Sequence, residues 1–279
     1  MDSSQVLAKL FYLKNTSTWT REKPFTLFID VSKVSGAQNS NIEKDPIDKI
    51  PIRDVRSCEL SLELDQNGFE VMDLEQEGHT PMCFDEEDWI ENEYLKFLCN
   101  KIKERLGAKE VRPYEYKKRY RHPGFGDTRL RGDDRFDPPI PQVHADMTSE
   151  YGKHFLEQNW PEAINSERLQ VLNVWRPLIN HITEWPLALC DYKSVDRDSD
   201  LISTDQVKPA KGPGTTDSTF AIVESYVSFH NPRHTWYYLK NQTFNEGWLF
   251  KIYDSKESAA QGPGEKPRRS IETRLMVAY

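Results

Sequence analysis

Short apolar runs follow one another through the second half of the chain and predict a series of β-strands. Breaks rich in Pro, Gly and Asp separate these runs, as in proteins built from short strands and turns. The expected strands cover residues 169–174, 220–229, 235–239, 248–253 and 271–279. A sheet of this size would expose unpaired edges, which a barrel or a sandwich closes. The C-terminal half is therefore expected to be mainly β.

One amphipathic helix is expected between Asp85 and Gly107. Asp85 suits the N-cap position, and Gly107 stands where a helix usually stops. Apolar side chains recur between them at three- and four-residue steps, at Ile90, Tyr94, Phe97, Leu98, Ile102 and Leu106. This spacing places them along one face, so the helix is expected to pack on the sheet.

The N-terminal part of the chain is expected to flank the same domain. Residues 1–80 alternate between short strand-like stretches, such as residues 25–31, and turn signals, of which Asn67-Gly68 is the strongest. We assign residues 81–279 to the core of the domain.

Composition and charge exclude several classes of partner. The chain has 279 residues and a net charge of −8, and its acids and bases are interspersed. It therefore lacks the basic stripe that follows nucleic-acid phosphates. No apolar run approaches the roughly 18 residues of a membrane span, and four scattered cysteines match no disulfide framework or zinc site. We expect a cytoplasmic protein whose partner is a small molecule, rather than nucleic acid or membrane.

The strongest local signal for chemistry is the tripeptide His144-Ala145-Asp146. It follows residues 123–141, where Gly, Pro, Asp and Arg without periodicity predict a long surface loop. In a strand, residues i and i+2 point to the same side, so both side chains can reach one ion. Two histidines and one carboxylate hold Fe(II) in many oxygenases and leave positions open for a co-substrate and O2. The tripeptide is short, and a surface histidine beside an acid is the alternative.

Several longer segments resemble one known family. They are NVWRPL at 173–178, WPLALCD at 185–191, HTWYY at 234–238, FKIYDS at 250–255 and RRSIETR at 268–274. Their order and content are similar to those of the fungal and bacterial hydroxylase/desaturase family, which includes gibberellin-desaturase-like and cephem-methoxylase-like proteins. The resemblance covers about residues 50 to 279.

The resemblance implies a fold, two cofactors and a set of site residues. The fold is a double-stranded β-helix (jelly-roll) barrel with flanking helix, and the cofactors are Fe(II) and 2-oxoglutarate. His144 and Asp146 take the roles of two metal ligands. Arg268 and Ser270 match the R-x-S motif that binds the co-substrate carboxylate, a task that suits the planar, permanently charged guanidinium of arginine. Arg274 is the next candidate for that task.

The chain departs from the family at the third metal ligand. The family has a histidine after the Tyr-Asp-Ser segment, but the last histidine of this chain is His234, before that segment. Glu257 occupies the expected position, and a carboxylate can also bind Fe(II). Alternatively, His230 or His234 turns into the site, or the site holds metal poorly.

Two classes of function follow from this departure. The first is an active oxygenase that hydroxylates or desaturates a small specialised metabolite. The second is a non-oxidative relative, which either supports an active homologue in a homo- or heterodimer or uses the pocket for isomerisation or cyclisation. Asn173 and Arg176 are further candidates for the pocket, and because they lie on opposite faces of one strand, no more than one of the two can face it.

Overall fold

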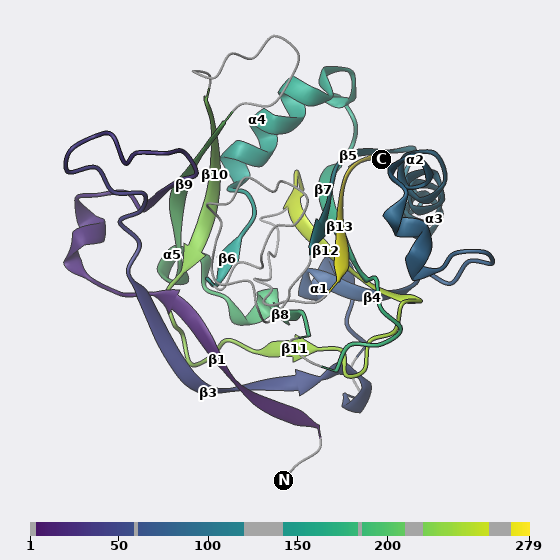
Figure 1. Cartoon of the computed structure of the whole chain (residues 1–279), viewed down its shortest axis with the longest axis horizontal. Helices are drawn as coiled ribbons and strands as arrows, with labels where there is room; N and C mark the ends of the chain where they lie inside the picture. Colours follow the sequence, from purple (N-terminus) through teal and green to yellow (C-terminus); the bar gives the residue numbers. More distant parts are fainter. Residues whose placement is uncertain (1–3, 59–60, 120–141, 184–185, 210–219, 257–268) are drawn as a thin grey trace.

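Three β-sheets with helices at their margins make up the protein (Figure 1). The computed structural model describes residues 4–58, 61–119, 142–183, 186–209, 220–256 and 269–279. The first sheet has the order β1 (Gln5–Leu13), β3 (Lys44–Asp54), β11 (Trp236–Tyr238), β8 (Ala188–Cys190). The second has the order β2 (Phe25–Leu27), β9 (Leu201–Pro209), β10 (Phe220–Ser228), β6 (His144–Ala145). The third has the order β4 (Phe69–Asp73), β12 (Glu246–Asp254), β7 (Leu169–Pro177), β13 (Ser270–Ala278), β5 (Glu110–Arg119).

The helices are short apart from two. They are α1 (Leu64–Asn67), α2 (Glu87–Trp89), a π-helical turn (Ile90–Tyr94), α3 (Leu95–Leu106), α4 (Ser149–Asn159) and α5 (Arg197–Asp200). The mainly β class with flanking helices is confirmed. Among the described strands, hydrogen bonding gives three separate sheets that do not close into one barrel. No helix in the described ranges is both long enough and apolar enough to span a bilayer.

The strands predicted from apolar runs are present with small changes in their ends. The run at 169–174 extends to Pro177 as β7, and every residue of β7 is buried. β7 lies between β12 and β13 in the third sheet, and its alternate residues belong to two different core clusters, with Leu172 and Val174 in one and Leu169 and Val171 in the other. Because both faces of the strand are buried, its sequence needs no alternation. In contrast, residues 25–31 form a strand only as far as Leu27.

Two strands that the sequence did not predict contain proline at an open edge. Pro46 and Pro51 lie in β3, most of which pairs with β1 alone, and Pro113 lies in β5 at the edge of the third sheet. Proline cannot donate a hydrogen bond to a neighbouring strand, so it is tolerated where one edge is free. The two prolines and the many charged residues of β3 made its sequence unlike that of a strand. β9 and α4 were also not predicted.

The expected helix is present, but it begins differently from the prediction. Gly107 ends α3 in the left-handed conformation, with φ of 64°, as expected. The prediction that Asp85 is the N-cap is wrong: the first helical residue is Glu87, and Glu86 precedes it without a side-chain cap. Asp85 instead forms an ion pair with Arg269, just before β13.

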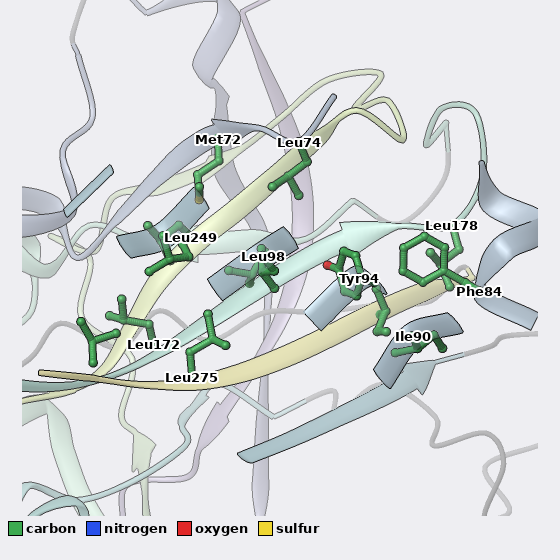
Figure 2. Close-up of a cluster of buried hydrophobic side chains, with 14 of the residues drawn as sticks. Met72, Leu74, Phe84, Ile90, Tyr94, Leu98, Leu172, Leu178, Leu249 and Leu275 are labelled. Carbon is green, nitrogen blue, oxygen red and sulfur yellow. The ribbon is translucent and has the colours of Figure 1, made fainter. Parts of the chain in front are cut away.

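The largest hydrophobic core lies between this helix and the third sheet. Tyr94, Leu98 and Ile102 are fully buried on the inner helix face. Figure 2 shows Leu98 among side chains from the sheet, including Leu249 of β12 and Leu275 of β13. Burying one such leucine contributes about 1.5–3 kcal/mol. The helix therefore covers one face of the sheet, and the opposite face is available to build a site.

Candidate functional site

The segment that carries His144 is held by hydrogen bonds at both ends. β6 pairs antiparallel with Tyr226–Val227 of β10, and the backbone N–H of Val143 donates to Phe11 O at 2.8 Å. Thr148 caps α4 and also donates its hydroxyl to Glu224 Oε2 at 2.6 Å. In Figure 1, β6 lies between β10 and the strands of the third sheet. The segment therefore has little freedom to move relative to the two sheets.

Alternation along this segment directs its two polar side chains to one side. Val143, Ala145 and Met147 are buried at or below 5% exposure. His144 and Asp146, at the intervening positions, remain partly exposed at 13% and 19% of their side-chain areas. Apolar packing of the odd-numbered residues thus fixes the direction of the even-numbered pair.

The two side chains converge in the way that two ligands of one ion would. His144 Nδ1 lies 2.7 Å from Gln142 O, and its Nε2 lies 3.4 Å from Asp146 Oδ1. A carbonyl oxygen only accepts, so Nδ1 carries a hydrogen, and Nε2 is the ring nitrogen that faces the carboxylate. The two facing atoms are the ones through which a histidine and an aspartate bind a metal. Ligands at right angles about 2.1 Å from one metal lie about 3 Å apart, so this pair fits a metal.

The other oxygen of Asp146 is held by an arginine from the last strand. Arg274 Nη2 donates to Asp146 Oδ2 at 3.1 Å, and Nη1 donates to Glu115 Oε2 at 2.8 Å. Burial opposes ionisation of Asp146, but the charge of Arg274 and the contact with His144 outweigh it, so its pKa lies well below the usual range. The pKa of Glu115 is lowered against burial by Arg274 and Lys117.

A wider cluster of charges surrounds this pair. Arg119 of β5 forms a two-point contact with Glu272 of β13, at 2.6 and 2.9 Å. Lys117 Nζ lies 3.4 Å from Glu115 Oε1. Lys208 of β9 also belongs to the cluster, since burial and the nearby cations Lys117 and Arg274 lower its pKa to about 8. The space between the second and third sheets is therefore strongly charged.

The structure places only some of the predicted site residues. Ser270 is 2% exposed at the start of β13, and alternation puts it on the same face as Arg274. Glu257 and Arg268 lie outside the described residues. Within the described ranges, no group of three or more His, Cys, Asp or Glu side chains is arranged to hold a metal. Of the three predicted metal ligands, the described part of the site thus contains two, His144 and Asp146, and their role as ligands stays a prediction.

His234 has both ring nitrogens engaged elsewhere. Its Nε2 donates to Asp200 Oδ2 at 3.1 Å, and its Nδ1 accepts from the Tyr12 hydroxyl at 3.2 Å. The His234 side chain is 3% exposed. His230 contacts the edge of the same tyrosine, with ring centroids 5.0 Å apart. His234 would have to break two buried hydrogen bonds to bind a metal.

Of the two polar residues on β7, Asn173 lies on the site face. Asn173 pairs across the sheet with Arg274, and residues paired in this way share a face. Its Oδ1 is buried and has no hydrogen-bond partner among the described residues. Arg176 is on the helix side, where it donates to Phe244 O and Leu74 O at 2.9 and 3.1 Å.

The sequence did not single out Glu115 or Lys208 as site residues. Glu115 lies in β5 and Lys208 in β9, and the polar and charged composition of these strands kept the sequence from indicating either residue. Arg274 appeared only as a second choice for the co-substrate, although its spacing from Ser270 by an even number of residues was a usable signal.

Comparisons with known proteins agree on one family and one fold. The family model described as oxidoreductase/YMDC permease-like domain matches residues 10–278. The hydroxylase/desaturase efuI of Hormonema carpetanum is 30% identical over 256 residues, which cover 82% of this chain and 83% of that protein. The Fe(II)/2-oxoglutarate-dependent dioxygenase nvfI of Aspergillus novofumigatus is 25% identical over 274 residues and 90% of both chains.

A solved structure of the iron and alpha-ketoglutarate-dependent endoperoxidase NvfI superposes with a TM-score of 0.80. The match covers 100% of this chain and 99% of that one, at 19% sequence identity. This likeness confirms the jelly-roll type of fold that the sequence resemblance implied.

Replacing Arg274 with Gln should destabilise the protein by about 1–3 kcal/mol at pH 7, because the partly buried Asp146 and Glu115 would keep their charges without their shared cation. The folded-state pKa of Asp146 is lowered, so this contribution is present above its unfolded pKa of about 3.9 and is lost as the pH falls below it. Urea unfolding of wild type and variant should therefore converge at acid pH. Lys153→Gln, on the exposed side of α4, is the control and should change stability by no more than about 0.5 kcal/mol. Equal stability of wild type and Arg274→Gln at pH 7 would contradict the prediction.

Proposed function

This chain belongs to the oxidoreductase/YMDC permease-like family, and we propose that it uses Fe(II), 2-oxoglutarate and O2 to hydroxylate or desaturate a small specialised metabolite. The observation that carries the proposal is the convergence of His144 Nε2 and Asp146 Oδ1 at 3.4 Å, with Nδ1 fixed by a backbone carbonyl. This is the donor arrangement that a metal requires, and it is supported by relatives named hydroxylase/desaturase and Fe(II)/2-oxoglutarate-dependent dioxygenase.

His144, Asp146 and Glu257 are the proposed metal ligands. Arg274 occupies Asp146 Oδ2, which leaves Oδ1 as the oxygen available to a metal. Glu257 stands about ten residues before Arg268, the spacing that a third ligand and its R-x-S motif should have. Two carboxylates and one histidine form a harder, more anionic set than two histidines and one carboxylate. We therefore expect weaker selectivity for Fe(II) over Mn(II) and Mg(II).

Arg268 and Ser270 are the proposed binding residues for the distal carboxylate of 2-oxoglutarate. Ser270 begins β13 on the site face and is buried, which supports its use as a hydrogen-bond donor to a bound group. Arg274 is already shared by two carboxylates of the protein, so it is less available for a ligand. This makes Arg268 the better candidate for the two-point contact with a carboxylate.

The overall reaction consumes one O2 and one 2-oxoglutarate for each substrate molecule. Bound iron supplies the activation of O2, which the protein's side chains cannot provide. One oxygen atom enters the succinate formed with loss of CO2, and the other enters the hydroxylated product or, in a desaturation, water. The chain's own contribution is to hold the ligand carboxylate through Arg274 and to keep the His144 ring in one tautomer through Gln142.

The non-oxidative alternative keeps one observation in its favour. Among the described residues, no third ligand accompanies His144 and Asp146. A subunit that supports an active homologue in a dimer, or an isomerase or cyclase that reuses the pocket, would need no such ligand. The amount of iron bound per protein distinguishes these functions from that of an oxygenase.

We also propose a single domain in a cytoplasmic protein. Pairing of β3 with β11 supports the assignment of residues 1–80 as a flank of the core at 81–279. All four cysteines are free thiols, which supports a reducing compartment.

His144→Ala should abolish iron binding while leaving the fold intact, because the side chain is a partly exposed ligand and not a core residue. Iron per protein is measured after anaerobic reconstitution, and folding by thermal unfolding. His154→Ala, on the exposed side of α4, is the matched control and should bind iron as wild type does. An unfolded His144→Ala protein would favour a structural role, and unchanged iron content would remove His144 from the site.

Glu257→His tests the third ligand. If Glu257 is a ligand, the substitution should preserve or tighten Fe(II) binding and make it more selective against Mn(II), because imidazole replaces an oxygen donor. If the natural site is inactive, the same change should create iron binding where none existed. Metal titrations of wild type and variant measure both effects. An unchanged affinity for both metals would exclude position 257 from the site and favour the non-oxidative function.

Arg268→Lys should raise the concentration of 2-oxoglutarate required for half-maximal turnover at least tenfold, because lysine keeps the charge but loses the two-point contact. The adjacent Arg269→Lys is the control, since Arg269 pairs with Asp85 on the helix side. It should leave the 2-oxoglutarate requirement unchanged. Co-substrate dependence is measured from succinate formation, and an unchanged dependence in Arg268→Lys would redirect the assignment to Arg274.

A further inference from the structure

Lys208 faces the charged space between the sheets. It pairs with Ala221 across β9 and β10, and Val227 of the same strand pairs with His144. Paired residues share a face, and so do alternate residues of one strand, so Lys208 and His144 lie on the same face of the second sheet. The Lys208 ammonium lies 5.4 Å from the centroid of the Phe28 ring. Its side chain is partly buried at the margin of the site.

Charged groups from three other parts of the fold act on Lys208. Lys117 and Glu115 come from β5, Arg274 from β13, and Asp146 from the segment after β6. Burial and the two cations disfavour the charged form and lower the pKa of Lys208 to about 8, while the two acids act in the opposite direction.

Both of those acids already have basic partners of their own. Glu115 is bonded to Arg274 at 2.8 Å and lies 3.4 Å from Lys117. Asp146 is bonded to Arg274 and contacts His144. In the described part of the chain, no carboxylate lies within ion-pair distance of Lys208. The lysine is therefore a partly desolvated cation, among other cations, with no counter-ion of its own among the described residues.

We propose that the Lys208 ammonium binds a carboxylate of the small molecule that enters the space between β9 and β5. The proposal rests on the proposed function in one respect, that a small molecule is bound between these sheets. A bound carboxylate would give Lys208 its missing counter-ion, and the charge-assisted hydrogen bond would be strengthened by the low local polarity. Such a carboxylate can belong to 2-oxoglutarate or to the organic substrate, and the two sources predict different binding patterns.

The test compares wild type with Lys208→Met in equilibrium binding to two pairs of probes. 2-Oxoglutarate is paired with 2-oxopentanoate, which has a methyl group in place of the distal carboxylate, and 4-phenylbutanoate is paired with its uncharged amide. Titrations use tryptophan fluorescence in metal-free buffer and again with Mn(II). Lys9→Met, on the exposed side of β1, is the matched control and should bind every probe as wild type does.

The binding results show which molecule supplies the carboxylate that Lys208 binds. If it belongs to 2-oxoglutarate, Lys208→Met should lower 2-oxoglutarate affinity about tenfold, toward that of 2-oxopentanoate, while Arg268 and Ser270 retain their part of the contact. If it belongs to the substrate, the loss should fall on 4-phenylbutanoate and spare its amide. Equal affinities of wild type and Lys208→Met for both acids would overturn the proposal. A wild-type protein that binds no iron would refute the proposed oxygenase, yet the metal-free titrations would still decide the role of Lys208.

The pH dependence provides an independent readout. Lys208 is charged below its pKa, so wild-type affinity for the acid should be constant below about pH 7 and should fall as the pH rises through 8. Lys208→Arg stays charged and should retain its affinity up to pH 9. Lys208→Met should show no such fall, and its melting temperature should equal or exceed that of wild type, because a cation without a partner has been removed. A large loss of thermal stability would indicate a structural role and overturn the proposal.

Discussion

The guanidinium of Arg274 joins three parts of the molecule that are far apart in sequence. Its backbone lies on β13, while its side chain donates to Glu115 on β5 and to Asp146 just after β6. Two partly buried carboxylates repel each other and lose part of their hydration, so a cation between them favours their ionised forms. This pairing therefore sets how closely the β6 segment approaches the third sheet. The position of the candidate metal ligands depends on it.

The third sheet can serve a core and a site at once because its strands alternate. On β13, Ile271 and Leu275 face α3 and belong to the largest core. Glu272 and Arg274, at the intervening positions, face the second sheet. Packing of α3 against one side of the strand thus orients the charged groups on the other. A rigid hydrophobic layer directly behind a charged site keeps its side chains in place when a ligand enters.

The charged groups between the second and third sheets include several pairs of a carboxylate and a base. Within the described residues, each carboxylate of the protein there is paired with a base of the protein, whereas Lys208 lacks such a partner. Arg268 and Lys208 are 60 positions apart in the sequence, so the two proposed carboxylate contacts need not belong to one molecule. A co-substrate with two carboxylates and a substrate with one would both find charged partners in this space. If Lys208 binds the carboxylate of the substrate, and not that of the co-substrate, the site should select carboxylic acids as substrates.

The sequence by itself determined the local features of this protein. Apolar runs identified β7, β10, β12 and β13, of which β7, β12 and β13 are mostly buried, because a strand with both faces covered is apolar along its length. The i, i+2 spacing of His144 and Asp146 required only a locally extended backbone to bring both side chains to one side. The left-handed cap at Gly107 was likewise a property of a few consecutive residues.

Only the tertiary structure decided which distant residues complete the site. Glu115 and Asp146 are 159 and 128 positions from Arg274, and no periodicity relates them. Their meeting depends on sheet register, on the bulge in β5 and β13, and on which strand takes each sheet edge. Proline and charge made β3 and β5 look unlike strands, although both are tolerated where one edge stays open. Hydrophobic periodicity is a property of consecutive residues, whereas the pairing of the charges in the site depends on packing between residues that are distant in the sequence.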